Sequence, residues 1–470
     1  MNFEKRLFAL SLNSLNSLNS LMSAPCPRLP KHPNKNRTKK TNNFMKLRYN
    51  VDDRLPLSQL ALYALQWFIL AVAVVVTSVF VAQGSPEEKL FYAQKLFAVM
   101  GVAGFVQVMW GHRMPIVVGP AAVLLVGVLS ALNSNANSDA IYSSIAIGGV
   151  LITLLSFGGL MRHVQRIFTP RIIIVILMLI AFTLSPVIKN LVFPPMASGS
   201  SHLFGLIFTL VATPMMVILN RKMQGVAKSL VIPIALVLGS VAYYLFFPAG
   251  RFIHSEATLD GVFINNFELD LGVIIAFVIC YIALFINDIS SIESLGGMLQ
   301  TPDMERRMRR GVRLTGLFNI AAGALGVLGP VNYSMSPGVV ASTRCASRYA
   351  LIPATLLLVV CALSDRLIWI LTSIPNPVIG VILLFLMGTQ LAASLEMLHS
   401  TRSVTSFSDG LTIGLPLIAA MLFQLMPRGI LPQVIEPLVS NGFAMGVIMV
   451  VLLEHVVNRA PKEQKIDKVE

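Results

Sequence analysis

Charged residues are scarce in this chain, and their scarcity argues against a soluble fold. Of the 470 residues only 12% are Asp, Glu, Lys or Arg, whereas 55% are hydrophobic and the mean hydropathy is +0.74. A soluble domain with this balance would expose large apolar patches to water. We therefore set aside a soluble enzyme and expect an all-α polytopic membrane protein.

Signatures of catalysis and of metal binding are also missing. The chain has 4 cysteines but no CxxC pair and no Cys–His cluster, so neither a disulfide framework nor a metal site is expected. No HExxH, GxSxG or P-loop sequence occurs. The sequence therefore predicts no enzyme, no cofactor and no ATP-driven pump. An ion gradient, or the gradient of the transported solute, would have to supply the energy.

Long apolar runs fill the chain from Leu57 to Val457. Each membrane crossing needs about 20 mostly apolar residues, so this part has room for about fourteen crossings. They divide into two sets of seven, separated by a longer polar loop of residues 251–270. The expected spans are residues 57–82, 90–110, 115–133, 139–161, 169–191, 201–220, 227–247, 271–292, 309–328, 331–343, 349–371, 376–397, 409–427 and 437–457.

The net charge of +14 is unevenly distributed over the loops between these spans. Basic residues gather in alternate loops, whereas the intervening loops hold only Lys89, Arg251 and Arg428. By the positive-inside rule the basic loops and both termini face the cytoplasm, as expected of a multi-pass protein in the inner (plasma) membrane of a cell. The charge thus predicts topology and not a nucleic-acid surface. The basic loops contain Arg113, Arg162, Arg166, Arg171, Arg221, Lys222, Lys228, Arg306, Arg307, Arg309, Arg310, Arg313, Arg344, Arg348 and Arg402.

The ends of the chain differ from the rest in composition. Residues 11–21 repeat Ser, Leu and Asn, and residues 27–46 are rich in Pro, Asn and Lys. Such segments cannot bury enough apolar surface to fold alone, so residues 1–54 are expected to be a disordered basic cytoplasmic tail. A translation start at Met45 is an alternative of equal weight. Residues 458–470 are expected to form a second cytoplasmic tail.

Two of the expected spans are short and interrupted by glycine and proline. One opens with the sequence MPIVVGPAA from Met114, and the other with GPVNYSMSPG from Gly329. Proline removes a backbone donor and glycine loosens a helix, and irregular backbone at membrane depth is tolerated only inside protein or along a cavity. Interrupted segments at corresponding positions of two halves indicate the binding site of a secondary transporter.

A second similarity supports two related halves. The segment that starts at Ile167 resembles the segment that starts at Ser373, and each follows its interrupted span by a similar distance. Because seven spans per half is an odd number, the halves would lie in the membrane with opposite orientation. An inverted repeat of this kind is the architecture of alternating access.

Polar side chains inside spans are energetically expensive, which makes each one a functional candidate. In the eighth span Asn287, Ser290, Ser291 and Ser294 are expected to share one helical face that could hydrogen-bond a planar polar ligand.

Two acidic residues, Asp288 and Glu293, point elsewhere and are candidate proton carriers. For Glu293 we favour the alternative that it reaches only the interface or the arginines of residues 306–310. For Asp288 the two interpretations are balanced.

A second polar cluster lies in the tenth span, over residues 332–336. Backbone N–H groups at the start of a half-helix could bind a carbonyl or anionic oxygen there. Tyr333 and Met335 could enclose a flat ring. Packing of helices by small residues is the alternative, and we favour a binding role because the interruption itself needs an explanation.

Several short motifs resemble those of a known family in their order and spacing. They are Gln66-Trp67, the sequence GHRMPIVVGP from Gly111, Phe168-Thr-Pro, the polar cluster of the eighth span, the sequence GVVASTR from Gly338, and Ile374-Pro-Asn-Pro. The family is that of the nucleobase–ascorbate transporters, which includes bacterial uracil and xanthine permeases. The resemblance covers residues 57–457.

The resemblance implies about fourteen spans in a 7+7 inverted repeat with core and gate domains. The core would comprise residues 55–161 and 271–372, and the gate residues 162–250 and 373–457, with residues 251–270 as an external loop. Short strands would occur in the third and tenth spans, with the substrate between them and against the eighth, and the gate would form a homodimer in the lipid bilayer. The implied function is proton-coupled uptake of a nucleobase, a purine such as xanthine or else uracil, by alternating access.

Some positions depart from the pattern that the resemblance implies. The acidic residue of the eighth span falls on Asn287 or on its neighbour Asp288, and the acidic or glutamine position of the tenth falls on Met335. The stacking aromatic of the third span falls on Ala122, and the Gln-His pair of the first reads Gln66-Trp67. The candidate substrate-binding residues are Gln66, Gly119, Pro120, Ala121, Ala122, Asn287, Ser290, Ser291, Asn332, Tyr333, Ser334, Met335 and Ser336, and Asp288 and Glu293 are the candidates for proton coupling.

Two other functions remain open. An anion transporter of the sulfate-permease type would have the same architecture, although such proteins usually carry a large cytoplasmic C-terminal domain, and only residues 458–470 follow the last span here. A membrane sensor that has lost transport is the second alternative, because the acidic residues of the family's site are partly missing.

Overall fold

The structure is a computed structural model of the whole chain, in which residues 47–82, 84–157, 168–194, 199–223, 231–247, 262–427, 429–432 and 435–457 are described. The chain divides into two units, residues 1–45 and 46–470, and every element below belongs to the second. Several parts named above lie outside the described residues. They are residues 1–46, residues 458–470, the loop with Arg162 and Arg166, the first part of the external loop, Lys228 and Arg428.

The described part of the first half is almost entirely helical, because in apolar runs a helix satisfies every backbone hydrogen-bonding group without water. Its elements are α2 (Leu57–Val76), η1 (Val79–Val81), α3 (Pro86–Met109), β1 (Val118–Pro120), α4 (Ala122–Asn133), α5 (Ser138–Leu155), α7 (Pro170–Thr183), α8 (Ser185–Val192), α9 (Gly199–Lys222) and α11 (Val231–Tyr244).

The second half repeats this order. Its elements are α12 (Leu271–Leu299), α13 (Met304–Ala324), β2 (Pro330–Asn332), α14 (Ser336–Thr343), η3 (Arg348–Ala350), α15 (Leu351–Ala362), α16 (Asp365–Thr372), α17 (Asn376–Thr401), α18 (Phe407–Gln424), α19 (Glu436–Val439), α20 (Gly442–Leu452) and η4 (Leu453–Val457). Among the described residues, 8 helices are long and apolar enough to cross a membrane, or up to 9 if the bent pair α15–α16 counts as one. A multi-span protein is thus confirmed, whereas the count of about fourteen stays a prediction.

The two interrupted spans each contain a strand followed by a short helix, as expected. The strands β1 and β2 pair antiparallel, with Val118 opposite Asn332, Gly119 opposite Val331 and Pro120 opposite Pro330. The half-helix α4 follows β1 and the half-helix α14 follows β2. Segments more than 200 residues apart in sequence therefore meet at one short ladder.

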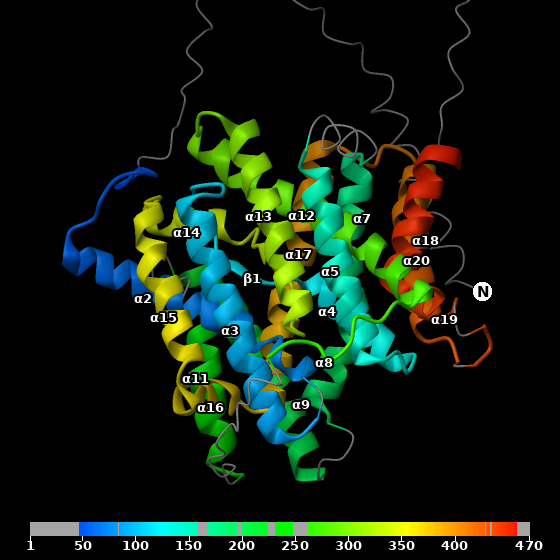
Figure 1. Ribbon diagram of the computed structural model, residues 1–470, viewed down its shortest axis with the longest axis horizontal. Coiled ribbons are helices and arrows are strands. Elements are labelled where there is room, and N and C mark those ends of the chain that lie inside the picture. The colour runs from blue at the N-terminus through cyan, green and yellow to red at the C-terminus, as the bar shows by residue number, and fades with distance from the viewer. Residues whose placement is uncertain are drawn as a thin grey trace, which may run out of the picture. The chain divides into compact units, whose positions relative to one another are not determined.

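The helices pack in two groups. In the first, α5 packs against α13 and α12, and α15 packs against α3 and α2; Figure 1 shows yellow α15 beside blue α3. In the second, α17 packs against α7, α8 and α9, and α18 lies beside α20, which Figure 1 draws in orange and red. The α5–α13 contact is very close, because a Cβ on Gly149 would lie 2.5 Å from the backbone nitrogen of Ile320.

An ion-pair cluster fixes one end of the second group. The guanidinium of Arg171, at the start of α7, lies 3.0 Å from Asp409 Oδ1 and 3.1 Å from Glu454 Oε2. Its Nε donates to the carbonyl of Ser403 at 2.6 Å. One side chain thus joins α7, α18, η4 and the segment before α18.

One expectation about continuity is wrong. Residues 349–371 were expected to form one span, but α15 and α16 meet at an angle of 101°. The break is stabilised by Ser364, whose Oγ accepts a hydrogen bond from the N–H of Leu367 and so caps α16.

The expectation of a disordered tail is wrong for its last part, residues 47–54. Tyr49 forms a bridge with Cys345, and its carbonyl accepts from the N–H of Ala346 at 2.9 Å. Arg348 Nε lies 2.7 Å from Asp52 Oδ1. The segment therefore packs along the connection between α14 and α15, where backbone pairing supplies the contacts that its composition could not predict.

Candidate functional site

A fully buried carboxylate joins α12 to the ladder of β1 and β2. Asp288 is 0% exposed. Its Oδ1 accepts hydrogen bonds from the backbone N–H of Asn332 at 3.0 Å and from Asn332 Nδ2 at 2.8 Å. Its Oδ2 is buried with no hydrogen-bond partner among the described residues. Because buried polar atoms are normally paired, an orphaned carboxylate oxygen marks a place for a proton or a ligand.

Asn332 also contacts a histidine that the sequence did not single out. His112 is 0% exposed, on the turn between α3 and β1, and its Nε2 lies 3.1 Å from Asn332 Oδ1. The other ring nitrogen, Nδ1, accepts from the N–H of Met114 at 3.0 Å. The structure thus joins two separately predicted candidates, Asp288 and Asn332, and His112 extends the contact.

Further buried polar residues from α3 and α13 surround this junction. Thr315 Oγ1 lies 3.5 Å from Asn332 Nδ2 and accepts from Gln107 Nε2 at 3.0 Å. Asn319 donates to the carbonyl of Pro330 at 2.9 Å and so supports β2. These residues were missed, although polar side chains inside the expected spans 90–110 and 309–328 were a signal that could have found them.

Tyr333 lies against the first-half strand, as the paired interruptions predict. Its hydroxyl donates to the carbonyl of Pro120 at 2.7 Å, and its N–H donates to the carbonyl of Val117 at 2.9 Å. A Cβ on Gly119 would lie 2.8 Å from Tyr333 Cε2, so glycine is needed for this approach. Ala121 is buried and Ala122 is half-buried at the start of α4.

The start of α14 is less open than expected. Ser336 is buried, and its Oγ donates to the carbonyl of Tyr333 and accepts from the N–H of Val117. The N–H groups of Ser336 and Gly338 bond within the turn, to the carbonyls of Tyr333 and Met335. These groups are therefore engaged, unlike the free donor set expected there. Ser334 is exposed and Met335 is half-buried.

The polar residues of α12 divide between two faces. Asn287 and Ser290 are half-buried, and Ser294 is exposed, so an accessible polar stripe runs along this helix. Ser291 is buried, and its hydroxyl donates to the carbonyl of Asn287, which differs from the shared face expected for it. Glu293 is exposed, whereas Asp288 lies in the interior. In α2, Gln66 is buried.

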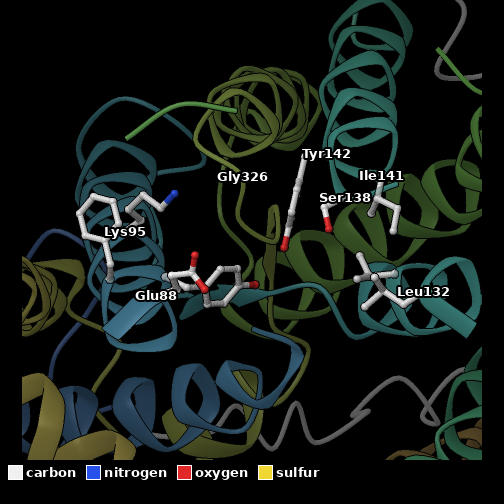
Figure 2. Close-up of a pocket in the computed structure, with 10 residues that line it drawn as sticks. Glu88, Lys95, Leu132, Ser138, Ile141, Tyr142 and Gly326 are labelled. Atoms are coloured by element: carbon white, nitrogen blue, oxygen red, sulfur yellow. The ribbon is translucent and has the colours of Figure 1, made fainter. Parts of the chain in front are cut away.

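Two cavities lie elsewhere in the described part of the chain. One of about 390 Å³ is lined by Ser130 of α4, Thr183 of α7, Asn376 of α17, Gln424 of α18 and Ser440. The other, of about 260 Å³, lies between α3, α4 and α5; Figure 2 shows the hydroxyls of Ser138 and Tyr142 directed into it and Lys95 at its edge. Lys95 sits over the Phe91 ring and donates to the carbonyl of Val262. Neither cavity is lined by a predicted site residue.

Comparison with known proteins gives one family. The model Xan_ur_permease, described as the Permease family, matches residues 58–429. The xanthine permease of Bacillus subtilis is 24% identical over 416 residues, covering 82% of this chain and 90% of that protein. The uric acid permease PucJ of the same organism is 23% identical over 370 residues, covering 75% and 81%. The xanthine permease XanP of Escherichia coli is 24% identical over 446 residues, covering 87% and 94%.

Solved structures share the fold at lower identity. The transmembrane domain of the cyanobacterial bicarbonate transporter BicA superposes with a TM-score of 0.54 at 12% identity, covering 86% of this chain and 100% of that one. The murine anion transporter Slc26a9 in its inward-facing state gives a TM-score of 0.54 at 12% identity, covering 94% and 75%. At these identities the likeness concerns the fold alone. It confirms the expected fold class, an all-α polytopic membrane protein, whereas the number of spans in each half stays a prediction.

Proposed function

The chain belongs to the permease family described by the Xan_ur_permease model, and on that basis we propose that it carries a nucleobase across a membrane. It is a multi-pass membrane permease and not an enzyme. The relatives named above are permeases for xanthine and uric acid. The proposed substrate is therefore a purine such as xanthine, with uracil as the pyrimidine alternative.

The observation that carries the proposal is the orphaned oxygen of Asp288 beside the ladder of β1 and β2. A purine edge alternates N–H donors and carbonyl acceptors, and a carboxylate oxygen accepts from such N–H groups. Along the same helix, the half-buried Asn287 amide can donate and accept, and Ser290 offers a hydroxyl. Tyr333 beside Gly119 supplies an aromatic wall. Together these side chains provide the few polar groups and the flat surface that a heteroaromatic ring needs.

We assign movement to the two groups of packed helices, as core and gate domains with the boundaries expected from the sequence. Among the described residues, few polar contacts cross from one group to the other: Ser134 Oγ lies 2.8 Å from Ser440 Oγ, and Asn441 Nδ2 lies 3.7 Å from Cys280 Sγ. Helix groups that share few polar contacts can move relative to each other, whereas α5 and α13 are packed too closely to slide past one another. Alternating access would move the site past the gate. A homodimer through the gate, and termini on the cytoplasmic side, complete the proposal.

Asp288 is also the proposed carrier of the coupling proton. Protonation of Oδ2 would neutralise the buried negative charge of the carboxylate, and the atom would then no longer be a charged oxygen without a hydrogen-bond partner. Glu293 is the weaker candidate, because an exposed carboxylate can exchange protons with water at any stage of the cycle.

An anion is the second candidate substrate, since the two solved structures named above are a bicarbonate transporter and an anion transporter. The chemistry of the site argues against it. A buried carboxylate repels an anion at short range, and among the described residues no cation contacts Asp288. A neutral heterocycle meets no such repulsion.

Uptake into cells that lack their own permeases tests the proposal. Labelled xanthine, hypoxanthine, guanine, uric acid and uracil are supplied separately, with and without an uncoupler. Saturable accumulation of one base that collapses with the uncoupler is the expected result. Movement of bicarbonate or sulfate instead would favour the anion alternative, and binding without movement would favour a sensor.

Two variants of α12 assign the proton. Asp288→Asn is expected to abolish uphill accumulation of the transported base. Glu293→Gln, a matched control one to two turns along the same helix, is expected to leave it within about twofold of the wild-type value. Accumulation that survives Asp288→Asn and fails in Glu293→Gln would reverse the assignment.

A further inference from the structure

His112 stands outside every helix and strand, yet its side chain is completely buried. It lies on the turn between α3 and β1 and is 0% exposed. Its ring contacts the backbone of its own turn through Met114 and the second half of the chain through Asn332. A buried ring with both nitrogens engaged has one orientation and one proton position.

The partners of the ring decide which nitrogen carries the proton. The N–H of Met114 can only donate, so His112 Nδ1 is an acceptor at 3.0 Å. The neutral ring then carries its proton on Nε2, which donates to Asn332 over 3.1 Å. The atom of Asn332 that faces the ring must therefore be the acceptor Oδ1. Its amide nitrogen is left facing Asp288 Oδ1 at 2.8 Å.

All three hydrogen bonds consequently run in one direction, from Met114 through His112 and Asn332 to Asp288. If the Asn332 amide were reversed, its NH2 group would point at the N–H of His112 Nε2, so that two donors would meet. Its carbonyl oxygen would point at the carboxylate of Asp288, so that two acceptors would meet. Both ends are buried, so neither mismatch could be relieved by water.

The turn that carries His112 is fixed from its outer side. Arg307 Nη1 donates to the carbonyls of His112 and Arg113, each at 3.0 Å, and Arg307 Nε donates to the carbonyl of Pro302 at 3.1 Å. Arg113 itself has a φ of 55°, in the left-handed region. The imidazole is thus presented from a clamped backbone.

We propose that His112 is a positioning residue for Asp288. Through the amide of Asn332 it keeps an N–H donor on Oδ1 and leaves Oδ2 as the atom that meets the transported base or the coupling proton. The part played by Oδ2 rests on the proposed function, whereas the orientation of the amide does not.

Two substitutions of His112 test its two hydrogen bonds separately, because each amide can replace one of the two ring nitrogens. In His112→Asn the side-chain oxygen can still accept from Met114, but the donor to Asn332 is lost. In His112→Gln the amide nitrogen reaches the place of Nε2 and can still donate to Asn332. His112→Asn is therefore expected to lower uphill uptake of labelled xanthine about tenfold or more and to share the phenotype of Asp288→Asn. His112→Gln is expected to retain most of the uptake.

A double-mutant cycle of melting temperatures, measured on the full-length protein in detergent, tests the coupling between His112 and Asp288 without any substrate. The melting temperatures of the wild type, His112→Asn, Asp288→Asn and the double variant are compared. The described link between His112 and Asp288 runs through Asn332. If the two residues are coupled, the melting temperature of the double variant should fall much less than the sum of the decreases in the two single variants. His112→Asn combined with Arg171→Gln, in the other helix group, is the control and should be additive.

The outcomes separate this proposal from the proposed function. Should the wild type move no base, the proposed function fails, and the double-mutant cycle still decides on His112. Additive melting temperatures, or His112→Gln as damaging as His112→Asn, would overturn the positioning role. Should His112→Asn alone not fold, its recovery in the Asp288→Asn background would support the proposal, and lack of recovery would overturn it.

Discussion

A methyl group added at the centre of β1 should distort the candidate site, and the structure gives the size of the effect. A Cβ at Gly119 would lie 2.7 Å from Val74 Cγ1 and 2.8 Å from Tyr333 Cε2, far inside normal van der Waals contact. Neither neighbour moves easily, because Val74 is 1% exposed and Tyr333 is held by its 2.7 Å bond to Pro120. Overpacking of this kind costs about 1–3 kcal/mol.

The strain introduced by Gly119→Ala is expected to lower both the affinity for the transported base and the stability of the protein. If about 1 kcal/mol of it falls on the Tyr333 ring, the affinity for the transported base weakens about fivefold. The remainder should lower the melting temperature of the protein in detergent. The KM of uptake and the melting temperature, measured on the same preparation, check the two parts separately.

Gly338 provides the matched control for this change. It lies in α14, and a Cβ there would meet nothing within 4 Å. Gly338→Ala is therefore expected to be neutral or to stabilise the protein by about 0.4–1 kcal/mol. Val74→Ala should relieve part of the strain when combined with Gly119→Ala. The packing argument would be refuted if Gly119→Ala and Gly338→Ala had equal melting temperatures. It would also be refuted if adding Val74→Ala to Gly119→Ala did not raise the melting temperature.

Three further changes test the scaffold around the site. Arg171→Gln leaves two carboxylates facing each other, and because the guanidinium is 26% exposed we expect a loss of about 1–2 kcal/mol, read as a lower melting temperature. Asp52→Asn breaks an ion pair whose carboxylate is 64% exposed, so the same measurement should change by at most about 0.5 kcal/mol. Gly149→Leu should yield no folded protein on size-exclusion chromatography, since its side chain would have to enter the backbone of α13 at 2.5 Å; recovery of monodisperse protein would contradict that close contact.

The sequence predicted the two interruptions because their cause is local, whereas the short strands within them were implied by the family resemblance. Glycine and proline interrupt two apolar runs at corresponding places, and an interrupted run at membrane depth must be buried in protein. Asp288 was a candidate for a similar reason, since an ionisable residue in the middle of a span is costly wherever it points. Both inferences need only residue types and spacing.

The remaining features depend largely on tertiary packing, and apart from Ser364, which caps α16, they carry little local signal. His112 follows Gly111 in a polar turn, and only the approach of α13 and β2 buries it. The bend between α15 and α16 falls at Leu363 and Ser364, within an apolar run that contains no proline or glycine at the break. The pairing of Tyr49 with Cys345 joins segments almost 300 residues apart, for which composition is uninformative.

The two halves of the chain contribute unequally to the ladder, although their backbones correspond. In the register of β1 and β2, Val118, Gly119 and Pro120 face Asn332, Val331 and Pro330, so Asn332 is the single polar side chain among the six. The first half therefore supplies space at Gly119, and the second half supplies the polar side chain of the ladder.

This division explains how a repeated scaffold can hold an asymmetric ligand. A duplicated pair of half-helices offers two equivalent positions. Among the described residues, only the position beside Asn332 has a buried carboxylate within 3.0 Å of its backbone. The first half reaches that carboxylate indirectly, through the ring of His112. In the proposed function, the symmetry of the fold would therefore provide the movement, and the residues that break the symmetry would provide the chemistry.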